Sequence, residues 1–443
     1  MSEPPSPRAG APKATGAEPN PVSTDLDSNE QPLRGVRAAI AYDGLFPWSI
    51  GGAERWYRAL AEGLARAGAN VTYVTRLQWD NPPQIEGVEV VAVRGPRDIY
   101  HADGTRRVDQ PIRYAVGLMS WMLRNRGSFD ILHLANFPYF PLLATRAALA
   151  RTGQPVLVDW FEVWPERYWT EYGGKMVGRF GYLIQELCIR LTPTALVFWD
   201  HTAQRLREHG LKSRPVVLPG LLPDADPSAG VARDRLTSPA TVFFSGRHIK
   251  DKGVMLLPEA LRIARAQIPD LHLVIAGEGV QTPLVRAKVE ALGLSHCVKF
   301  VGKLTDTDLF SHIAGAACVA VPSIREGYGL AAVEANAHGT PAIVTDGPEN
   351  AAVGHIINGR NGYLVPPTPA GVAGGIVRAV KAGPTLRQTT FEEYARMTTE
   401  NGIGRSIDRV VGLYLDALAG TRRGADAAGP AGANGSLDER ALT

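Results

Sequence analysis

The sequence predicts an α/β protein in which two doubly wound domains, each built on a parallel sheet, face each other across a cleft. The first observation is length, because 443 residues of which 45% are hydrophobic can bury two or three cores. The second is the alternation of short β-rich apolar runs with longer helical patterns, which is typical of parallel sheets with crossover helices. The third is a break in this alternation at residues 218–240, which are dense in Pro, Asp and Ser.

The apolar runs form one set on each side of residues 218–240, so we expect the linker there. Ligands of such sheets bind at the carboxyl ends of the strands, which places a site in the cleft. The helical pattern at residues 390–419 is expected to pack back across the first domain. The predicted parts are two sheet domains, 34–220 and 221–390, and a helical segment, 391–420. The expected strands lie within residues 37–44, 70–77, 88–95, 130–136, 155–161 and 195–201, then 240–246, 271–279, 298–303, 318–323, 341–347 and 362–367.

The two ends of the chain differ from the rest in composition. Residues 1–33 are rich in Pro, Ala, Ser and Asn, and residues 421–443 are similar. Neither segment has enough apolar side chains to offset the entropy lost on ordering. We therefore expect both to be disordered tails.

Charge and cysteine content limit the class of protein. The formal net charge of +3, from 47 basic and 44 acidic residues, gives no indication of nucleic-acid binding, so any anion site must be local. Cys188, Cys297 and Cys318 are odd in number and lie in apolar sequence, which indicates buried, reduced thiols. No signal peptide or membrane-spanning segment is evident. We expect a cytoplasmic protein, at most peripheral on the inner face of the membrane.

Two cations follow the first expected strand of the second domain. Gly246 ends this strand, Arg247 and Lys252 come within the next six residues, and Gly253 precedes a helical pattern. Arg supplies a planar fork and Lys a point charge, so the pair suits a diphosphate whose charge grows as it leaves. A solvated basic turn is the alternative interpretation.

The segment after residues 318–323 combines glycines with carboxylates. Gly327 and Gly329 permit close approach of a ligand to the backbone, and a helix expected from Leu330 presents its N-terminus to an anion. Glu326 and Glu334 would then accept hydrogen bonds from sugar and ribose hydroxyls rather than meet phosphate directly. The alternative is a solvated strand end followed by an ordinary helical glutamate.

Together these motifs resemble the retaining GT-B glycosyltransferases of family GT4, also called glycosyltransferase group 1. The resemblance covers roughly residues 36–419 and includes "IGGAER" after the first strand, similar to the family's glycine-rich loop. It implies the GT-B fold, with two Rossmann-like domains, and a nucleotide-diphosphate-sugar donor, UDP- or GDP-linked, without a further cofactor or metal. Its implied acceptor is a carbohydrate or glycolipid hydroxyl.

The resemblance also implies roles for individual residues. Arg247 and Lys252 match the diphosphate-binding pair, Glu326 the residue that contacts the donor sugar, and Glu334 the ribose-binding carboxylate. Arg247, Lys252 and Glu326 are therefore the expected catalytic residues. The remaining donor contacts that it implies are Gly51, Gly52, Gly246, Leu304 for the base, and the segment Tyr328, Gly329, Leu330 and Ala331.

One position departs from the family pattern. The family often has a histidine next to the donor sugar after the fifth strand of the first domain, where this chain has Phe161. Asp159 and Glu162 could share that role or contact the acceptor, and His133 is another candidate for the cleft. Each could equally be a structural polar residue at a strand end.

Aromatic and amphipathic segments leave further alternatives open. Trp160, Trp164, Tyr168 and Trp169 could stack on sugar rings or form core beneath a loop. The patterns at residues 112–126 and 172–190 mix apolar faces with Arg and Lys, which could rest on an anionic membrane or pack on their sheet.

The function that the sequence predicts is transfer of a sugar from a nucleotide-diphosphate-sugar to an acceptor hydroxyl, with retention at the anomeric carbon. Because of Phe161, a catalytically weak sugar-nucleotide-binding protein is one alternative. A GT-B-like epimerase acting on the nucleotide sugar is another. Incubation with donor alone separates them, because an epimerase needs no acceptor.

Overall fold

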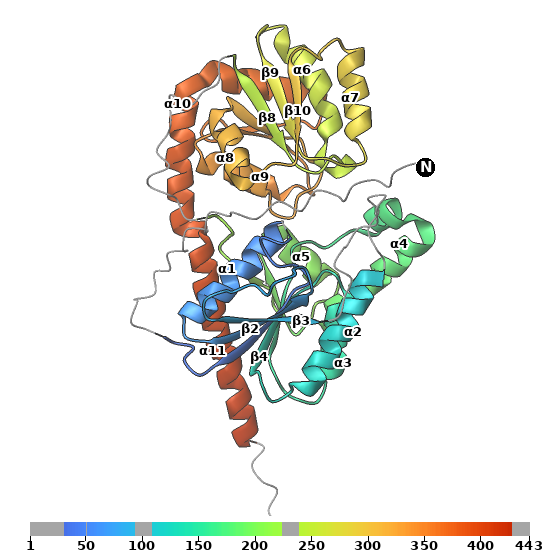
Figure 1. Ribbon diagram of the computed structural model, residues 1–443, viewed down its shortest axis with the longest axis vertical. Coiled ribbons are helices and arrows are strands. Elements are labelled where there is room, and N and C mark those ends of the chain that lie inside the picture. The colour runs from blue at the N-terminus through green and yellow to red at the C-terminus, as the bar shows by residue number, and fades with distance from the viewer. Residues whose placement is uncertain (1–30, 50, 94–108, 224–238, 428–443) are drawn as a thin grey trace, which may run out of the picture.

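The computed structural model describes residues 31–49, 51–93, 109–223 and 239–427, and these form two sheet domains joined by long C-terminal helices (Figure 1). The expected tails lie almost entirely outside the described residues, as does most of the expected linker. Leu33 was assigned to the N-terminal tail, but it is fully buried and its N–H donates to the carbonyl of Ala67 at 2.9 Å. The ordered chain therefore begins earlier than the composition suggested.

The N-terminal domain contains a seven-stranded sheet in the order β3-β2-β1-β4-β5-β6-β7. Every adjacent pair of strands is parallel. Six of these strands coincide with the apolar runs of the sequence, whereas β7 has 2 residues and was too short to give a pattern. The strands are β1 (Arg37–Ala41), β2 (Asn70–Arg76), β3 (Val88–Val93), β4 (Ile131–Ala135), β5 (Val156–Asp159), β6 (Thr194–Val197) and β7 (Val216–Val217).

Helices cover both faces of this sheet. One core contains buried side chains of α1 and of the C-terminal helix α11, and the other contains those of α2, α3 and α4. Parallel strands buried on both faces explain why the strand sequences are almost continuously apolar. The helices are α1 (Gly52–Arg66), α2 (Asp109–Arg124), α3 (Phe140–Ala148), α4 (Glu166–Leu191) and α5 (Asp200–Glu208).

The C-terminal domain contains a six-stranded parallel sheet in the order β10-β9-β8-β11-β12-β13. All six strands lie within the runs that the sequence predicted. The strands are β8 (Thr241–Ser245), β9 (His272–Ala276), β10 (Val298–Gly302), β11 (Cys318–Val321), β12 (Ala342–Thr345) and β13 (Gly362–Val365). The helices are α6 (Leu257–Arg265), α7 (Thr282–Ala291), α8 (Asp306–Gly315), α9 (Leu330–Ala337) and α10 (Pro369–Asn401), with short 3₁₀ turns η2 (Lys250–Lys252), η3 (Val254–Leu256) and η4 (Ala351–His355).

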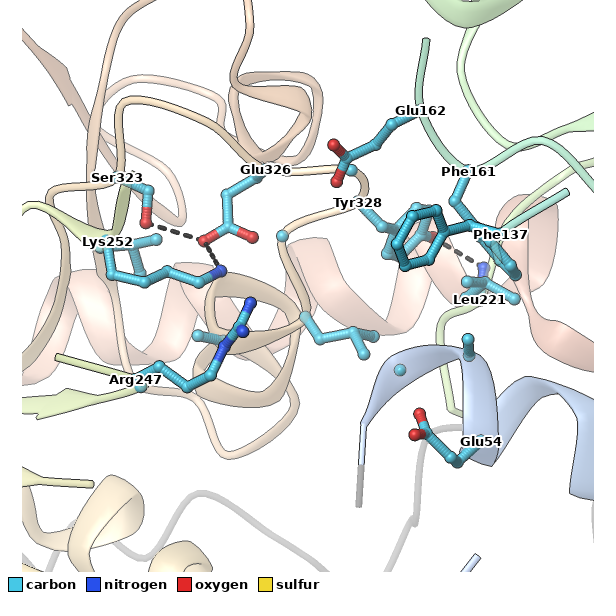
Figure 2. A pocket seen from close by; sticks show the side chains of 18 of the residues that line it. Glu54, Phe137, Phe161, Glu162, Leu221, Arg247, Lys252, Ser323, Glu326 and Tyr328 are labelled. Carbon is cyan, nitrogen blue, oxygen red and sulfur yellow. Dashed lines mark hydrogen bonds and ion pairs between the residues drawn. The ribbon is translucent and has the colours of Figure 1, made fainter. Parts of the chain in front are cut away.

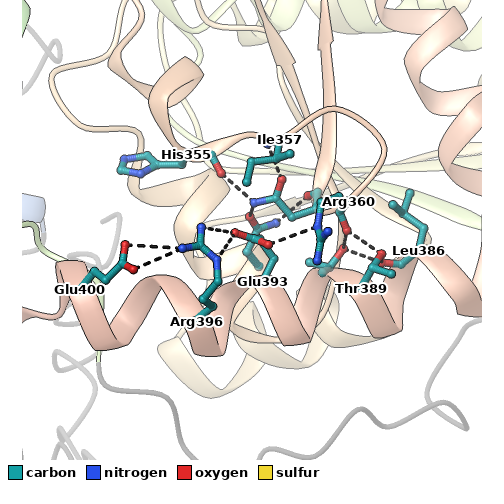
Figure 3. Close-up of polar contacts among 11 residues, drawn as sticks. His355, Ile357, Arg360, Leu386, Thr389, Glu393, Arg396 and Glu400 are labelled. Carbon is teal, nitrogen blue, oxygen red and sulfur yellow. Dashed lines mark hydrogen bonds and ion pairs between the residues drawn. The ribbon is translucent and has the colours of Figure 1, made fainter.

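Helix α10 belongs to the C-terminal domain and is bent at Gly383, which has a φ of 54° and directly precedes Pro384. Its polar face is fixed by Glu393, a buried carboxylate that pairs with Arg396 at 2.6 Å and with Arg360 at 3.3 Å (Figure 3). Thr389 donates to the carbonyl of Arg360 at 2.6 Å. These contacts attach the helix to the loop before β13.

Helix α11 (Ile403–Ala427) returns to the N-terminal domain and packs on α1. A Cβ on Gly63 of α1 would lie 2.6 Å from Ile407, so the two helices are in close contact. The Tyr414 hydroxyl lies 3.3 Å from His133 Nδ1. The helix continues to Ala427, beyond the end expected at residue 420.

This architecture, two Rossmann-like domains with a C-terminal helical crossover, is the GT-B fold that the sequence predicted.

Candidate active site

A cavity of about 480 Å³ lies between the two domains, at the carboxyl ends of both sheets (Figure 2). Segments after β8 and β11 line it from the C-terminal domain, while α1 and the segments after β4 and β5 line it from the N-terminal domain. Of the residues predicted as donor or sugar contacts, those in the cavity wall are Gly52, Phe161, Glu162, Gly246, Arg247, Lys252, Glu326, Tyr328, Gly329, Leu330 and Ala331.

Arg247 and Lys252 enter the cavity from the turn after β8, and Figure 2 shows both side chains beside Glu326. Lys252 Nζ lies 2.7 Å from Glu326 Oε1, and Ser323 Oγ donates to the same oxygen at 2.7 Å. Gly253 has a φ of 64°, and a Cβ there would overlap the carbonyl of Pro322. A glycine is therefore required for the β8 turn to approach the β11 turn this closely.

Main-chain hydrogen bonds hold the Glu326 segment in place. Its N–H donates to the carbonyl of Glu349 at 3.0 Å, and its own carbonyl accepts from Ala351 at 3.0 Å. The Asn350 side chain donates to the carbonyl of Ser323 at 3.0 Å. Ser323 and Asn350 were not predicted, because both lie in loops whose approach to Glu326 depends on the fold.

Gly329 allows α9 to begin at the cavity. It has a φ of 92°, and a Cβ there would overlap Ala352. The first turn of the helix, including Leu330 and Ala331, lines the cavity next to Arg247 and Lys252. The first N–H groups of a helix have no partner inside the helix and attract anions. The cavity wall therefore combines two cationic side chains with a helix N-terminus.

Tyr328 connects the cavity to the segment between the domains. Its hydroxyl accepts a hydrogen bond from the N–H of Leu221 at 2.7 Å, and burial raises its pKa to about 12. Its carbonyl lies 2.8 Å from His355 Nε2. Because burial lowers the pKa of His355 to about 4, the imidazole is neutral and donates to this carbonyl at physiological pH.

The N-terminal domain contributes a glycine and a carboxyl from α1. A Cβ on Gly52 would lie 2.5 Å from Leu330 Cδ1, so the two domains approach closely here. Glu54 lines the cavity and accepts from Ser49 Oγ at 3.0 Å, and burial raises its pKa. Gly51, predicted as a donor contact, lies at the N-cap of α1 just outside the cavity wall.

Aromatic side chains form much of the wall on the N-terminal side. Phe137, Tyr139, Phe161 and Trp164 line the cavity. Phe161 stacks on Phe198, with ring centroids 5.9 Å apart and planes 8° from parallel. Of the other tryptophans considered for sugar stacking, Trp160 and Trp169 are buried in the core and do not line the cavity.

Glu162 forms an ion pair between the domains. Its Oε2 lies 2.9 Å from Arg325 and accepts from Trp164 Nε1 at 2.7 Å. The Arg325 guanidinium also lies over the rings of Trp164 and Tyr168, 4.8 and 3.9 Å from their centroids. Glu162 thus reaches the cavity but is already paired.

The structure places two candidates for the sugar pocket in the core instead. His133 on β4 and Asp159 on β5 are fully buried and lie 2.9 Å apart, from Nε2 to Oδ1. Trp56 Nε1 donates to Asp159 Oδ2 at 2.7 Å. Both side chains are satisfied inside the N-terminal domain, and neither lines the cavity.

Leu304 and Glu334 also lie outside the cavity wall. Leu304 is half-buried after β10 and packs against the core of the C-terminal domain. Glu334 faces Arg55 and Asp306, which themselves pair across the domains at 2.9 Å. Burial raises the pKa of Glu334 to about 7, with a smaller increase from Asp306 opposed by Arg55.

Three further findings concern the described residues as a whole. Among the described residues, no cluster of three or more His, Cys, Asp or Glu side chains has the arrangement of a metal site. Within the same part of the chain, no helix has the length and apolar character needed to cross a membrane. Cys188, Cys297 and Cys318 are free thiols in the core, as predicted.

Comparison with known proteins identifies the family. Residues 233–398 match the family described as "Glycosyl transferases group 1", and residues 51–220 match the family described as "Glycosyl transferase 4-like domain". The sequence is 25% identical to glycogen synthase from Mycobacterium tuberculosis (strain CDC 1551 / Oshkosh) over 397 residues, which cover 85% of this chain and 94% of that protein. The chain belongs to the group 1 glycosyltransferases, family GT4, and is a glycosyltransferase.

Solved structures agree on the fold. Sucrose-phosphate synthase from Thermosynechococcus elongatus superposes with a TM-score of 0.71 at 19% identity, covering 87% of this chain and all of that one. HepE from Anabaena, in complex with UDP-glucose, superposes with a TM-score of 0.64 at 15% identity, covering 86% and 99% of the two chains. At these identities the similarity extends to the GT-B fold alone.

The raised pKa of Glu334 predicts a pH-dependent stability. The unfolded chain loses this proton above the ordinary value of 4.5, whereas the folded protein keeps it until about pH 7. The free energy of unfolding should therefore fall as pH rises from 4.5 to 7, then level off. Glu334→Gln removes this contribution, so the variant should gain stability relative to the parent across that window. Urea unfolding of both proteins at several pH values tests this, and a constant difference would contradict it.

Proposed function

We propose that the protein transfers a sugar from a nucleotide-diphosphate-sugar to an acceptor hydroxyl with retention at the anomeric carbon. The observation that carries this proposal is the convergence of Arg247, Lys252 and the N-terminus of α9 on one wall of the cavity, beside Glu326. A UDP- or GDP-sugar supplies the matching diphosphate, and the complex of HepE with UDP-glucose supports a donor of this class. The acceptor is a carbohydrate or glycolipid, and the protein acts in the cytoplasm.

The positive wall stabilises the diphosphate as it leaves. When the bond between the anomeric carbon and the diphosphate oxygen breaks, negative charge grows on the phosphate next to Arg247, Lys252 and the α9 amides. Charge-assisted hydrogen bonds to the departing group strengthen as its charge increases. The acceptor oxygen attacks from the same face and its proton passes to a phosphate oxygen, which gives retention without a protein nucleophile.

Glu326 has a geometry suited to a sugar hydroxyl. Its Oε1 is occupied by Lys252 and Ser323, whereas its Oε2 has no hydrogen bond from any described residue. A carboxylate held at one oxygen and open at the other can accept from a donor hydroxyl without rotating. Fixed positioning of this kind lowers the entropy cost of reaching the transition state.

The acceptor is proposed to bind along the aromatic wall of the N-terminal domain. Phe137 and Trp164 present ring surface to the cavity opposite the cations. Sugar rings have apolar faces that pack on aromatic side chains, with hydroxyls directed to the edges. Glu54 lies on the same side, and burial raises its pKa, which favours the neutral carboxyl, a form that offers both a donor and an acceptor.

Loss of either cation should reduce turnover strongly and leave folding stability nearly unchanged. We expect Arg247→Ala and Lys252→Ala each to lower kcat by about 10²–10³-fold, the usual effect of losing a group that stabilises transition-state charge. Lys250→Ala is the matched control, because Lys250 lies in the same turn with an exposed side chain outside the cavity. Release of nucleoside diphosphate measures turnover, and equal kinetics for all three variants and the parent would remove these cations from the site.

Turnover should not require a divalent cation. The charge of the diphosphate is balanced in this proposal by Arg247, Lys252 and the α9 N-terminus, so chelation leaves the main stabilising groups intact. The protein should therefore turn over at the same rate before and after dialysis against EDTA. Loss of activity that magnesium or manganese restores would contradict the metal-free mechanism.

Phe161→His should alter the choice of donor sugar. A phenyl ring in the wall cannot pair with a sugar hydroxyl, and a buried hydroxyl left unpaired costs about 1–3 kcal/mol. The histidine supplies a hydrogen-bonding group. The ratio of kcat/KM values between donors whose sugars differ in one hydroxyl should therefore change, while the free energy of unfolding changes little. Donors sharing one base provide the comparison. If every donor changes by the same factor, Phe161 does not contact the sugar.

A further inference from the structure

The second half of α4 exposes a continuous apolar stripe. After Gly174, whose φ of 71° breaks the helix, Met176, Phe180, Leu183 and Leu187 recur at positions i, i+4, i+7 and i+11 and therefore share one face. Their side chains are 87%, 61%, 56% and 46% exposed. Scattered exposed apolar residues are ordinary on a protein surface, but a row along one helix marks an interaction site.

The opposite face of the same helix is firmly packed. Cys188 and Ile189 are fully buried in the core of the N-terminal domain. Gln185 accepts from the Tyr139 hydroxyl at 2.9 Å and donates to the carbonyl of Trp164 at 2.8 Å. The helix is thus already fixed to its sheet by one face, and the stripe is a second apolar face.

Cations lie along one edge of the stripe. Lys175 and Arg179 are exposed and stand one turn apart beside Met176 and Phe180. The only carboxylate in residues 172–191 is Glu186, which is mostly buried and already pairs with Arg190 and His209. Within residues 172–191 the exposed surface therefore combines apolar and positive side chains, and the one carboxylate is already paired.

This combination favours one occupant. We propose that the α4 stripe, Met176, Phe180, Leu183 and Leu187 with Lys175 and Arg179, docks the protein on an anionic lipid bilayer. The apolar side chains would enter the boundary between headgroups and acyl chains while the cations contact lipid phosphates. A second copy fits less well, because an antiparallel two-fold contact along the stripe would bring the cationic edges of both copies together.

The position of α4 relates the surface to the cleft. Its first half follows Trp164 in the cavity wall and contacts the C-terminal domain, where Tyr168 donates to Asp251 and Glu171 pairs with Lys250 at 3.3 Å. In Figure 1, α4 lies on the side of the N-terminal domain away from α11. Docking through this helix holds the cleft near the bilayer, where a lipid-linked acceptor is presented. This consequence rests on the proposed function, whereas the binding itself does not.

Flotation of the full-length protein with lipid vesicles tests the surface. The parent should co-float with phosphatidylcholine vesicles that contain about 30% phosphatidylglycerol and remain unbound to pure phosphatidylcholine. Lys175→Ala combined with Arg179→Ala should weaken binding about 25-fold, because each cation near an anionic surface contributes about fivefold. Phe180→Glu should weaken it by about tenfold or more, since a charge replaces an inserted ring.

Matched controls separate this surface from general charge or apolar content. Val280→Glu changes an 81% exposed apolar residue in the C-terminal domain, and Lys299→Ala removes an exposed cation there. Both should bind vesicles like the parent. All variants alter exposed side chains, so the melting temperature should not change, and a thermal shift by UDP-glucose without vesicles checks that the cleft is intact.

The outcomes distinguish the surface from the proposed function. Absence of parent binding to anionic vesicles, or equal binding by Phe180→Glu and Val280→Glu, would overturn the lipid surface even if donor turnover is observed. A parent dimer in solution that Phe180→Glu dissociates would also overturn it, since the stripe would then join two copies. Selective loss of vesicle binding in the α4 variants would support the surface, whether or not the protein turns over a donor.

Discussion

The cationic wall of the cleft depends on the ion pair between Lys252 Nζ and Glu326 Oε1, which is 2.7 Å long. It joins the turn after β8 to the turn after β11, and the close approach of these turns at Gly253 makes it geometrically possible. A partly buried carboxylate needs such a partner, because an unpaired charge in this position would be costly. Glu326 offsets part of the charge of Lys252, and Arg247 and the N-terminus of α9 add positive charge to the same wall.

The sequence predicted the strands, and the position of Arg247, Lys252 and Glu326 after them, because both depend on local patterns. Glycines and charges directly after apolar runs must lie at the carboxyl edge of a parallel sheet, which is where Arg247, Lys252 and Glu326 lie. The direction of a side chain is harder to predict in a strand that is buried on both faces. His133 and Asp159 illustrate this, because both lie near the ends of strands yet point into the core. The two-residue strand β7 and the long extent of α10 and α11 also had no clear local signal.

Contacts between the domains could not be predicted, because they depend on how closely the two sheets approach. Arg55 with Asp306, Glu162 with Arg325, and Arg205 with Glu349 pair across the rim of the cleft. The Arg55–Asp306 pair is partly exposed and contributes little to stability alone, whereas Arg325 is mostly buried and its guanidinium also lies over the rings of Trp164 and Tyr168.

Helix α11 is part of the N-terminal core although it is encoded at the other end of the chain. Ile407, Val410 and Tyr414 fill the space beside α1, and Tyr414 reaches the buried His133. During synthesis the N-terminal sheet leaves the ribosome first, but the helix that completes its core emerges last. Chains grow from the N-terminus and domains generally fold as they emerge. In this protein the N-terminal domain therefore cannot complete its core until the C-terminal domain and α11 have been translated, and the apolar surface beside α1 stays uncovered until then.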